Sequence, residues 1–541
     1  MKMKKNMARL LSLFLIPAVL VGCGAQPAGP SPSGTAPAAP QSPAGTTEPV
    51  KDPYEPIEGK KYHILWTANQ TAPIAENPEI VQIFNEKFNV EIEVLNIESG
   101  KAEEIMGLKF AAGEIPDKFG STVNTMPKYY TQGVMAEIPQ EVLNKYAPNV
   151  VSHLESDQAG VLEYGKYEGN LYGIPQEIRL HNIYRAPLVY RGDWMKNLGV
   201  EKSPETLAEF ESLMYRFAKD DPDRNGKNDT YGLSDTSMTA VYGAFGYIPG
   251  NWMEKDGQLV YGAVQPEMKE ALTLLNKWFK DGVIDPEFIT GENTGGHASL
   301  THKFINGVIG TSSMSFYYQW QPMLREGGPV GRNYAELEKL NPEAVQSLVF
   351  GLPPVGPTGK RGINQGQTFT GAFSSFGVQL EKEPDKLGII LQMMDWVASD
   401  YENYLTGYYG EKGKNWEYNE IKQPIVIREE AKDTNWLNSQ GGHTIMVAFT
   451  PLEYSKIVSV DRVEWATKNQ FDIGGMQNEL IVALQSDGKF KAELQKIVDE
   501  AYISIITGDK PVDYFDEFVA KWKKSGGDQL TQEANEWYRQ K

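Results

Sequence analysis

The sequence predicts an α/β fold organised in two lobes, and three observations lead to this prediction. The chain has 541 residues, more than a single hydrophobic core usually organises, so two or three compact units are expected. Strand-like and helix-like patterns alternate along its body, without an internal repeat. Two β-rich segments, 170–190 and 365–378, have the composition of strands that cross between lobes.

The first elements of the body form a β-α-β pattern. Residues 61–66 are a short apolar run, 78–88 carry apolar residues at helical spacing, and 90–95 alternate like a second strand. The pattern continues with a helix at 104–112 and a strand at 115–119. Further amphipathic helices are expected at 207–219, 266–281, 384–399 and 490–507.

The segment 170–190 contains the turn-forming residues Gly173 and Pro175, followed by two β-rich runs. This composition predicts long strands that pass from one lobe into the other. The segment 365–378 is also β-rich and contains small residues. Either segment could instead form a hairpin within one sheet.

The N-terminus has the features of a signal peptide. Its first nine residues carry four basic side chains and no acid, and the apolar run 10–21 is too short to cross about 30 Å of hydrocarbon. The run leads into Gly22 and Cys23, the single cysteine of the chain, and resembles a bacterial lipobox. The resemblance implies cleavage after residue 22 and a lipid on the Cys23 thiol. An ordinary secretory leader is the alternative.

Residues 23–59 are expected to form a tether between the lipid and the folded body. They are rich in Pro, Ala, Gly, Ser and Thr and carry almost no large apolar side chains before Tyr54, so they cannot offset the entropy of ordering. The body is therefore assigned to residues 60–541. A low-complexity insert without a spacing role is the alternative.

Charge and cysteine content exclude several classes of protein. The 52 basic and 71 acidic residues give a formal net charge of −19, which becomes −23 when the four basic residues of the leader are removed. Nucleic-acid binding is not expected, because it requires clustered Lys and Arg. A single cysteine also excludes a disulfide framework and a cysteine-based metal site.

Several segments together resemble extracellular solute-binding proteins of carbohydrate-uptake ABC transporters, in the large lipoprotein branch of Gram-positive bacilli. They are, in order, 171–175 (LYGIP), 190–194 (YRGDW) with Leu198-Gly199, 256–261 (DGQLVY), 282–288 (GVIDPEF) and the C-terminal segment 507–538. The resemblance covers residues 60–541.

The resemblance implies a periplasmic-binding-protein-like fold of type II, with a ligand cleft between two lobes. Lobe 1 is expected at about 60–180 plus a later segment, and lobe 2 at about 185–370 plus a later segment. The implied function is to capture an oligosaccharide at the outer face of the membrane and deliver it to ABC permease subunits by lobe closure. The protein is then a lipid-anchored monomer with no catalytic residues.

The residues themselves carry no catalytic signature. The sequence contains no G-x-S-x-G elbow, Walker A loop, G-x-G-x-x-G fingerprint or H-E-x-x-H. The six histidines are scattered, and His297 and His302 have the wrong spacing for one helix face. A capture protein has no need of such motifs.

The most specific local motif is the segment 221–232, DPDRNGKNDTYG, which predicts a structural Ca²⁺ site. Oxygen side chains at loop positions 1, 3, 5 and 9, with glycine at 6 and a carbonyl at 7, match most of an EF-hand loop. The departure is Gly232, where a bidentate acid is expected at position 12. The alternative is a polar turn after a helix. The expected ligands are Asp221, Asp223, Asn225, Lys227 (through its carbonyl) and Asp229.

Sugars stack their C–H faces on aromatic rings and bind planar polar side chains through their hydroxyls, so aromatic residues in loops are the candidate ligand contacts. Trp66 ends the first strand, where ligands gather in open α/β sheets. For each candidate the alternative is packing in the core. The candidates are Trp66, Gln70, Arg179, Tyr184, Trp252, Trp320 and Trp436, with Trp66 and Trp252 preferred.

Two alternatives to oligosaccharide capture stay open at this point. A peptide or other nutrient receptor could use the same architecture, with hydrogen bonds directed at a peptide backbone. A surface glycoside hydrolase would need a pair of carboxylates, and no pair can be singled out. The kind of sugar and its charge are not fixed by these residues.

Overall fold

The computed structural model describes residues 52–69, 73–98, 100–176, 180–291, 300–325, 328–365, 371–420, 422–443 and 445–540. Cys23, Gln70, Arg179 and His297 lie outside these residues, as do the predicted leader and most of the predicted tether. Among the described residues, no helix is both long enough and apolar enough to cross a lipid bilayer.

The first sheet is built on two successive β-α-β units. Strand β1 (Tyr62–Asn69) pairs in parallel with β2 (Val90–Ile97) and with β3 (Lys118–Thr122). The intervening helices are α1 (Glu79–Phe88) and α2 (Ala102–Ala111), as parallel pairing requires a crossover. The strand order is β2-β1-β3-β13-β6, in which β13 (Ala372–Phe376) runs antiparallel to β3 and to β6 (Ile174–Pro175).

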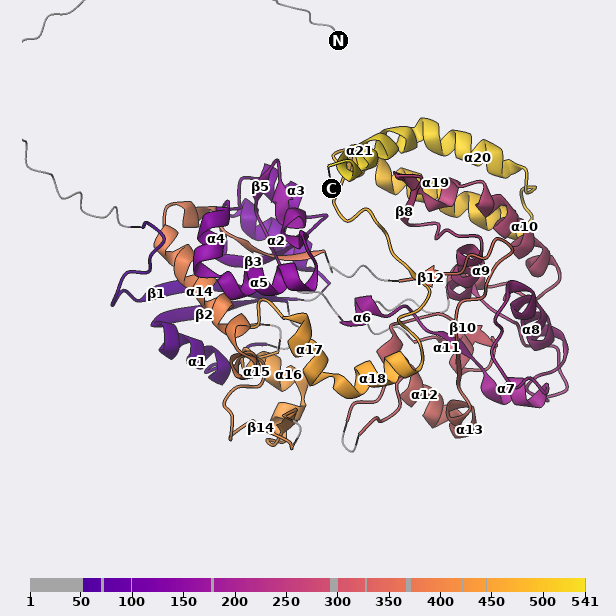
Figure 1. Cartoon of the computed structure of the whole chain (residues 1–541), viewed down its shortest axis with the longest axis horizontal. Coiled ribbons are helices and arrows are strands. Elements are labelled where there is room, and N and C mark those ends of the chain that lie inside the picture. The colour runs from indigo at the N-terminus through magenta and orange to yellow at the C-terminus, as the bar shows by residue number, and fades with distance from the viewer. Residues whose placement is uncertain are drawn as a thin grey trace, which may run out of the picture. The chain divides into compact units, whose positions relative to one another are not determined.

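Helices cover this sheet and complete the first hydrophobic cluster, which draws on residues 62–180 and 373–454. Figure 1 shows α4, α5 and α14 grouped beside the strands. Apolar residues of α14 at helical spacing, including Leu387, Ile390, Leu391 and Met394, are buried. The helices are α3 (Met126–Thr131), α4 (Gln140–Tyr146), α5 (Pro148–Asp157), α14 (Pro384–Ser399), α15 (Tyr401–Tyr409), α16 (Thr434–Ser439) and α17 (Leu452–Val458).

The second cluster is mainly helical and draws on residues 188–363 and 480–534. Its central pair is α10 (Glu267–Lys280) against α19 (Asp487–Thr507), with α20 (Tyr514–Trp522) and α21 (Asp528–Tyr538) packed beside them (Figure 1). Its other elements include β7 (Leu188–Tyr190), α7 (Gly192–Asn197), α8 (Leu207–Lys219), α9 (Met238–Ala244), β8 (Trp252–Lys255), β9 (Gln258–Tyr261), β12 (Ile363–Asn364) and β16 (Gly475–Met476).

A smaller cluster lies against β7 and contains Phe304, Trp320 and Leu337. It is formed by α11 (His302–Ile305), β10 (Thr311–Ser312), α12 (Arg332–Leu340), α13 (Pro342–Gln346) and β11 (Val349–Gly351). The strands β10 and β11 both pair antiparallel with β7.

The chain leaves the first cluster at residues 180–188 and returns to it at 363–373. The prediction of long strands over 170–190 is wrong. The segment contains the two-residue strands β5 (Asn170–Leu171) and β6, the short helix α6 (Leu180–Ile183) and the three-residue strand β7. Two prolines, Pro175 and Pro187, lack the N–H that a continuous strand ladder requires.

Candidate functional site

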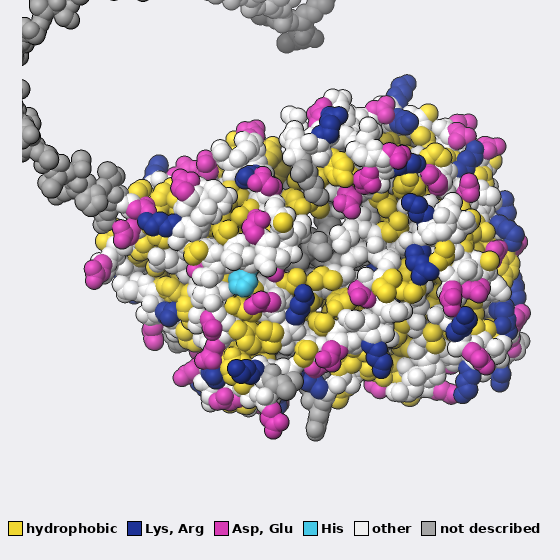
Figure 2. All heavy atoms as spheres, viewed as in Figure 1, with side chains coloured by type: hydrophobic (Ala, Val, Ile, Leu, Met, Phe, Trp, Pro, Cys, Tyr) yellow, Lys and Arg dark blue, Asp and Glu magenta, His cyan; other side chains and the backbone are white. Residues whose placement is uncertain are grey.

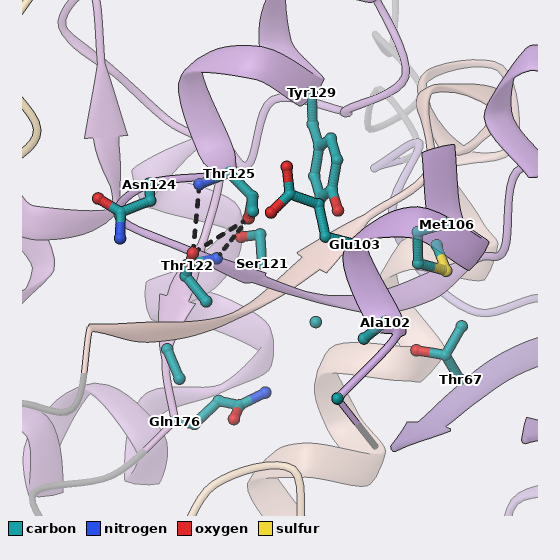
Figure 3. Close-up of a pocket in the computed structure, with 13 residues that line it drawn as sticks. Thr67, Ala102, Glu103, Met106, Ser121, Thr122, Asn124, Thr125, Tyr129 and Gln176 are labelled. Carbon is teal, nitrogen blue, oxygen red and sulfur yellow. Dashed lines mark hydrogen bonds between the residues drawn. The ribbon is translucent and has the colours of Figure 1, made fainter. Parts of the chain in front are cut away.

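A hollow of about 370 Å³ lies where β1 and β3 end, at the carboxyl edge of the first sheet (Figure 3). This is the edge at which open α/β sheets gather ligands. Segments far apart in the sequence meet here because β13 joins the sheet next to β3, and β6 pairs with β13. The lining includes Thr67, Glu103, Met106, Ser121, Thr122, Asn124, Thr125, Tyr129, Gln176 and Ala372.

Two threonines fix the floor of the hollow between β3 and α3. The backbone N–H of Thr122 donates to Thr125 Oγ1 at 2.9 Å, and the N–H of Thr125 donates to Thr122 Oγ1 at 3.2 Å. These reciprocal bonds hold the turn that starts α3 and leave the exposed Asn124 at its tip. Figure 3 draws this ring of bonds beside Ser121, whose hydroxyl lies 2.7 Å from that of Ser375.

Gln176 brings an amide into the hollow from the end of β6. Its Nε2 donates to the Phe373 carbonyl at 3.3 Å and lies 3.4 Å from Ser374 Oγ. Its backbone N–H and C=O bond to Ala372 and Thr450. The side chain is therefore held in place by the neighbouring strand β13.

Glu103 is the one acid among the described residues that line the hollow. It accepts a hydrogen bond from Lys128 Nζ at 2.8 Å. Burial, followed by the nearby Glu103 carboxylate, raises the pKa of Tyr129, so its hydroxyl stays protonated. Figure 3 shows this carboxylate beside the Tyr129 ring. The hollow thus offers hydroxyls, amides and one carboxylate, a set that binds polyhydroxylated ligands.

Trp66 was expected to face the ligand, and this expectation is wrong. The ring is 1% exposed, its Nε1 donates to the Ile445 carbonyl at 3.1 Å, and the Lys118 ammonium lies 4.8 Å from the ring centroid. Successive side chains of a strand point to opposite faces, so the next residue, Thr67, lines the hollow instead. The sequence indicated the correct strand end but the wrong face.

Trp320 and Tyr184 are also packed rather than exposed. Trp320 is fully buried, its Nε1 donates to the Met314 carbonyl at 3.1 Å, and it meets Phe304 edge to face. Tyr184 packs against the Tyr317 ring, with centroids 4.9 Å apart. Neither ring offers a free face for stacking, so both are assigned to the core.

Trp252 and Trp436 lie elsewhere. Trp252 is 7% exposed and lines a separate hollow of about 140 Å³ with Tyr261 and Trp522. Trp436 is half-buried, and the Arg428 guanidinium lies 4.4 Å from its ring centroid. The structure therefore does not bring the described aromatic candidates together, and none of them lines the hollow of Figure 3.

The residues that do line it could have been found from a local signal. Ser121, Thr122, Asn124 and Thr125 follow directly after the predicted strand 115–119. The carboxyl-end rule that selected Trp66 on the first strand applies equally to this strand. Gln176 and Ala372 carried no such signal, because antiparallel pairing of β13 brings them here.

The predicted Ca²⁺ loop follows α8, whose N-terminus has a capping box of Thr206 and Glu209. Within the loop, Asn225 Nδ2 donates to Asp223 at 2.8 Å and to Asp229 at 3.0 Å, and the Asn225 backbone N–H donates to Asp221 at 3.1 Å. Burial raises the pKa of Asp223, and the neighbouring carboxylates add to this shift.

Acid and amide side chains thus converge on one point, at which the Asn225 amide lies between two carboxylates. In this conformation, no three acid or histidine side chains among the described residues are arranged to hold a metal ion. Rotation of the Asn225 amide would present its oxygen to the same point. The donor set therefore has the chemistry that a hard cation prefers.

Packing explains the glycine at loop position 12. A Cβ built on Gly232 would lie 2.8 Å from the Met214 Cβ and carbonyl oxygen of α8. The Gly232 backbone also bonds to Val283 and Thr311 on both sides. An acid at this position has no room. The hydroxyl of Thr230, two residues earlier in the same loop, donates to the Phe217 carbonyl at 2.8 Å.

Comparison with known proteins identifies relatives along most of the chain. The polygalacturonan/rhamnogalacturonan-binding protein YtcQ of Bacillus subtilis is 25% identical over 486 residues, covering 84% of this chain and 86% of YtcQ. Lipoprotein LipO of the same organism is 24% identical over 517 residues, covering 92% and 90% of the two chains.

Solved structures share the fold. The alginate-binding protein AlgQ2, solved without calcium ion, superposes with a TM-score of 0.62 at 17% identity, covering 89% of this chain and 98% of its own. An HMO-binding solute-binding protein from Bifidobacterium longum infantis has a TM-score of 0.63 at 14% identity, with coverage of 89% and 99%. These likenesses confirm the predicted two-lobed α/β fold.

The family model described as bacterial extracellular solute-binding protein matches residues 79–380, more than half of the chain. The matched segment includes the hollow at the ends of β1 and β3 except Thr67, and it also includes the acidic loop after α8. The chain belongs to the bacterial extracellular solute-binding protein family.

Proposed function

We propose that the protein captures an oligosaccharide at the outer face of the membrane and delivers it to an ABC permease by lobe closure. The observation that carries this proposal is the hollow of Figure 3, whose hydroxyl and amide groups converge at the carboxyl edge of the first sheet. YtcQ is named for binding polygalacturonan and rhamnogalacturonan, and this supports a carbohydrate ligand.

The side chains that line this hollow also fit a protein that binds a sugar without cleaving it. Glycosidases flank the scissile bond with two carboxyl groups, whereas Glu103 is the one acid in the described lining and is occupied by Lys128. The exposed amide of Asn124 and the fixed amide of Gln176 serve as hydrogen-bond partners for sugar hydroxyls. Neither group can supply acid–base catalysis.

Isothermal titration with a panel of plant-polysaccharide oligomers tests this proposal. A sugar that binds wild type should bind Asn124→Ala and Gln176→Ala about fivefold to tenfold more weakly, because each variant loses about 1 kcal/mol of hydrogen bonding. Asn144→Ala, an exposed asparagine on α4, is the matched control. Chromatography of the titrated sugar checks for cleavage.

Three results would reject the proposal. Cleavage products would make the protein an enzyme. Binding of peptides but of no sugar would make it a peptide receptor. Unchanged affinity in both variants would move the sugar site away from this hollow.

We further propose that a lipid on Cys23 anchors the protein to the membrane and that the chain acts there as a monomer. LipO, which aligns with most of the chain, is named a lipoprotein, and this supports the anchor. Cys23→Ser should release the protein from the membrane fraction into the medium. Retention of this variant on the membrane would exclude the thiol as the attachment point.

The acidic loop after α8 is proposed to bind a structural Ca²⁺. Asp221, Asp223 and Asp229, with the Asn225 side-chain oxygen and the Lys227 carbonyl, would hold the ion. The bound cation would neutralise carboxylates that repel one another. It would also stiffen a loop that is tied to α7 by the bond from Asn197 Nδ2 to the Pro222 carbonyl, 2.8 Å long.

A further inference from the structure

A second polar hollow, of about 340 Å³, lies in the part of the chain that follows β7. It is bounded by α7, by the turn after α11 and by the junction of α12 with α13, and these elements lie together in Figure 1. Its lining includes Arg191, Trp194, Asp223, Asn306, Gly307 and Asn341. None of them lines the hollow of Figure 3.

Arg191 presents an unused edge of its guanidinium here. Its Nε and Nη2 donate to the two carboxylate oxygens of Asp193 at 2.9 and 2.5 Å, whereas Nη1 has no hydrogen-bond partner among the described residues. The residue is 4% exposed, and its guanidinium carbon lies 4.8 Å from the Trp194 ring centroid. The pair with Asp193 and the ring beneath therefore fix the orientation of the fork.

The Trp194 indole adds a second donor without a partner. Its Nε1 is buried and has no hydrogen-bond partner in the part of the chain that the structure describes. A buried donor left unpaired costs about 1–3 kcal/mol, so such groups normally meet an acceptor. Two donors that lack acceptors, on residues of the same hollow, point to a ligand rich in acceptor atoms.

Glycine at position 307 keeps the Arg191 edge open. A Cβ on Gly307 would lie 3.2 Å from Arg191 Nη1, so a larger side chain would crowd this nitrogen. The amide groups of Asn306 and Asn341 stand around the same space. The Asn341 oxygen is used by the Ala344 N–H at 2.9 Å, which leaves its NH₂ group available.

We propose that this hollow binds a small oxyanion, a carboxylate or a phosphate group, through the free edge of Arg191 and the Trp194 N–H. A guanidinium fork matches the two oxygens of such an anion and forms charge-assisted hydrogen bonds. This site is separate from the proposed oligosaccharide site and does not depend on it. The carboxylates of Asp193 and Asp223 oppose an anion, so the affinity is in the millimolar range.

Titration of the full chain with sodium acetate and, separately, with inorganic phosphate tests the site, at constant ionic strength and without added calcium. Gly307→Ala should weaken binding at least tenfold by crowding Arg191 Nη1. Gly257→Ala is the matched control, because its φ of +78° is close to the +73° of Gly307 but nothing lies within 4 Å of the added methyl. The control should bind as wild type.

Trp194→Phe is the second variant and removes only the indole N–H donor and part of the ring. It should weaken binding about fivefold, and circular dichroism checks that it is folded. Binding of acetate alone identifies a carboxylate site, and binding of phosphate alone identifies a phosphate site. The proposal is overturned if wild type binds neither probe at 20 mM, on the order of the expected affinity. It is also overturned if Gly307→Ala binds as tightly as Gly257→Ala.

Discussion

Lys118 offers the sharpest test of the energetics in the first lobe. It lies on β3 beside Trp66 of β1, is 5% exposed, and forms no ion pair among the described residues. Burial lowers the pKa of Lys118 from 10.5 to about 8. Replacing it with methionine keeps an unbranched side chain and removes the charge.

The size of the effect follows from the shift in pKa. At about 1.4 kcal/mol for each pH unit between 10.5 and about 8, burying the ammonium costs about 3 kcal/mol of folding free energy at pH 7. The cation–π contact with Trp66, 4.8 Å from ring centroid to nitrogen, offsets about 1–2 kcal/mol of this cost. We therefore expect Lys118→Met to stabilise the protein by about 2 kcal/mol at pH 7.

The pH dependence has a definite sign. Between pH 8 and 10.5 the unfolded chain holds the Lys118 proton that the folded chain has lost, so wild-type stability rises with pH across this window. The variant lacks this rise. The extra stability of Lys118→Met over wild type should therefore begin to shrink near pH 8 and disappear above pH 10.5.

Thermal melts followed by circular dichroism measure both effects. At pH 7 the midpoint should rise by about 4–8 °C in Lys118→Met, and at pH 10 the gain should be much smaller. Lys101→Met is the control, because that side chain is 58% exposed and should change the midpoint little at either pH. A lower midpoint for Lys118→Met at pH 7, or a gain that does not change with pH, would refute this reasoning.

Three other predictions concern the acidic loop, the packing of Gly232 and the burial of Trp320. Chelation of calcium from protein shown by elemental analysis to contain it should lower the melting temperature, and an unchanged melt would reject a structural ion. Gly232→Ala should destabilise the fold by about 1–3 kcal/mol in urea unfolding, because its methyl collides with Met214; a neutral effect would show that the contact relaxes. Trp320→Ala should destabilise by about 3–5 kcal/mol without altering the affinity of the remaining folded protein for sugar, whereas weaker binding would restore Trp320 to the ligand site.

Local patterns predicted many of the elements well, because they depend on residues three or four positions apart. The helices expected at 207–219 and 384–399 have these bounds in the structure, and the one expected at 78–88 begins a single residue later. Each has apolar residues at helical spacing on a buried face. Shorter strands were predicted less well: the strand expected at 115–119 is displaced to Lys118–Thr122.

The face of a strand that lines the hollow of Figure 3 could not be predicted in the same way. Trp66 and Thr67 are neighbours in β1, and their directions depend on which face the helices cover. Large aromatic side chains also remove the most apolar area from water when they are buried, and this favours folding. Trp66 and Trp320 therefore lie in the interior rather than on a ligand surface.

By itself, the sequence determined the alternating α/β elements and the acidic loop, because each depends on composition or short-range spacing. The leader with its single cysteine stays a prediction from the same kind of local pattern. The tertiary structure decided which residues line the proposed sugar site. Thr67, Glu103, Asn124, Gln176 and Ala372 are separated by up to 305 positions and meet because β13 inserts between β3 and β6. It also decided that Gly232 carries no ligand, because that position is packed against α8. Contacts between distant segments arise from strand pairing and core packing, which no local pattern encodes.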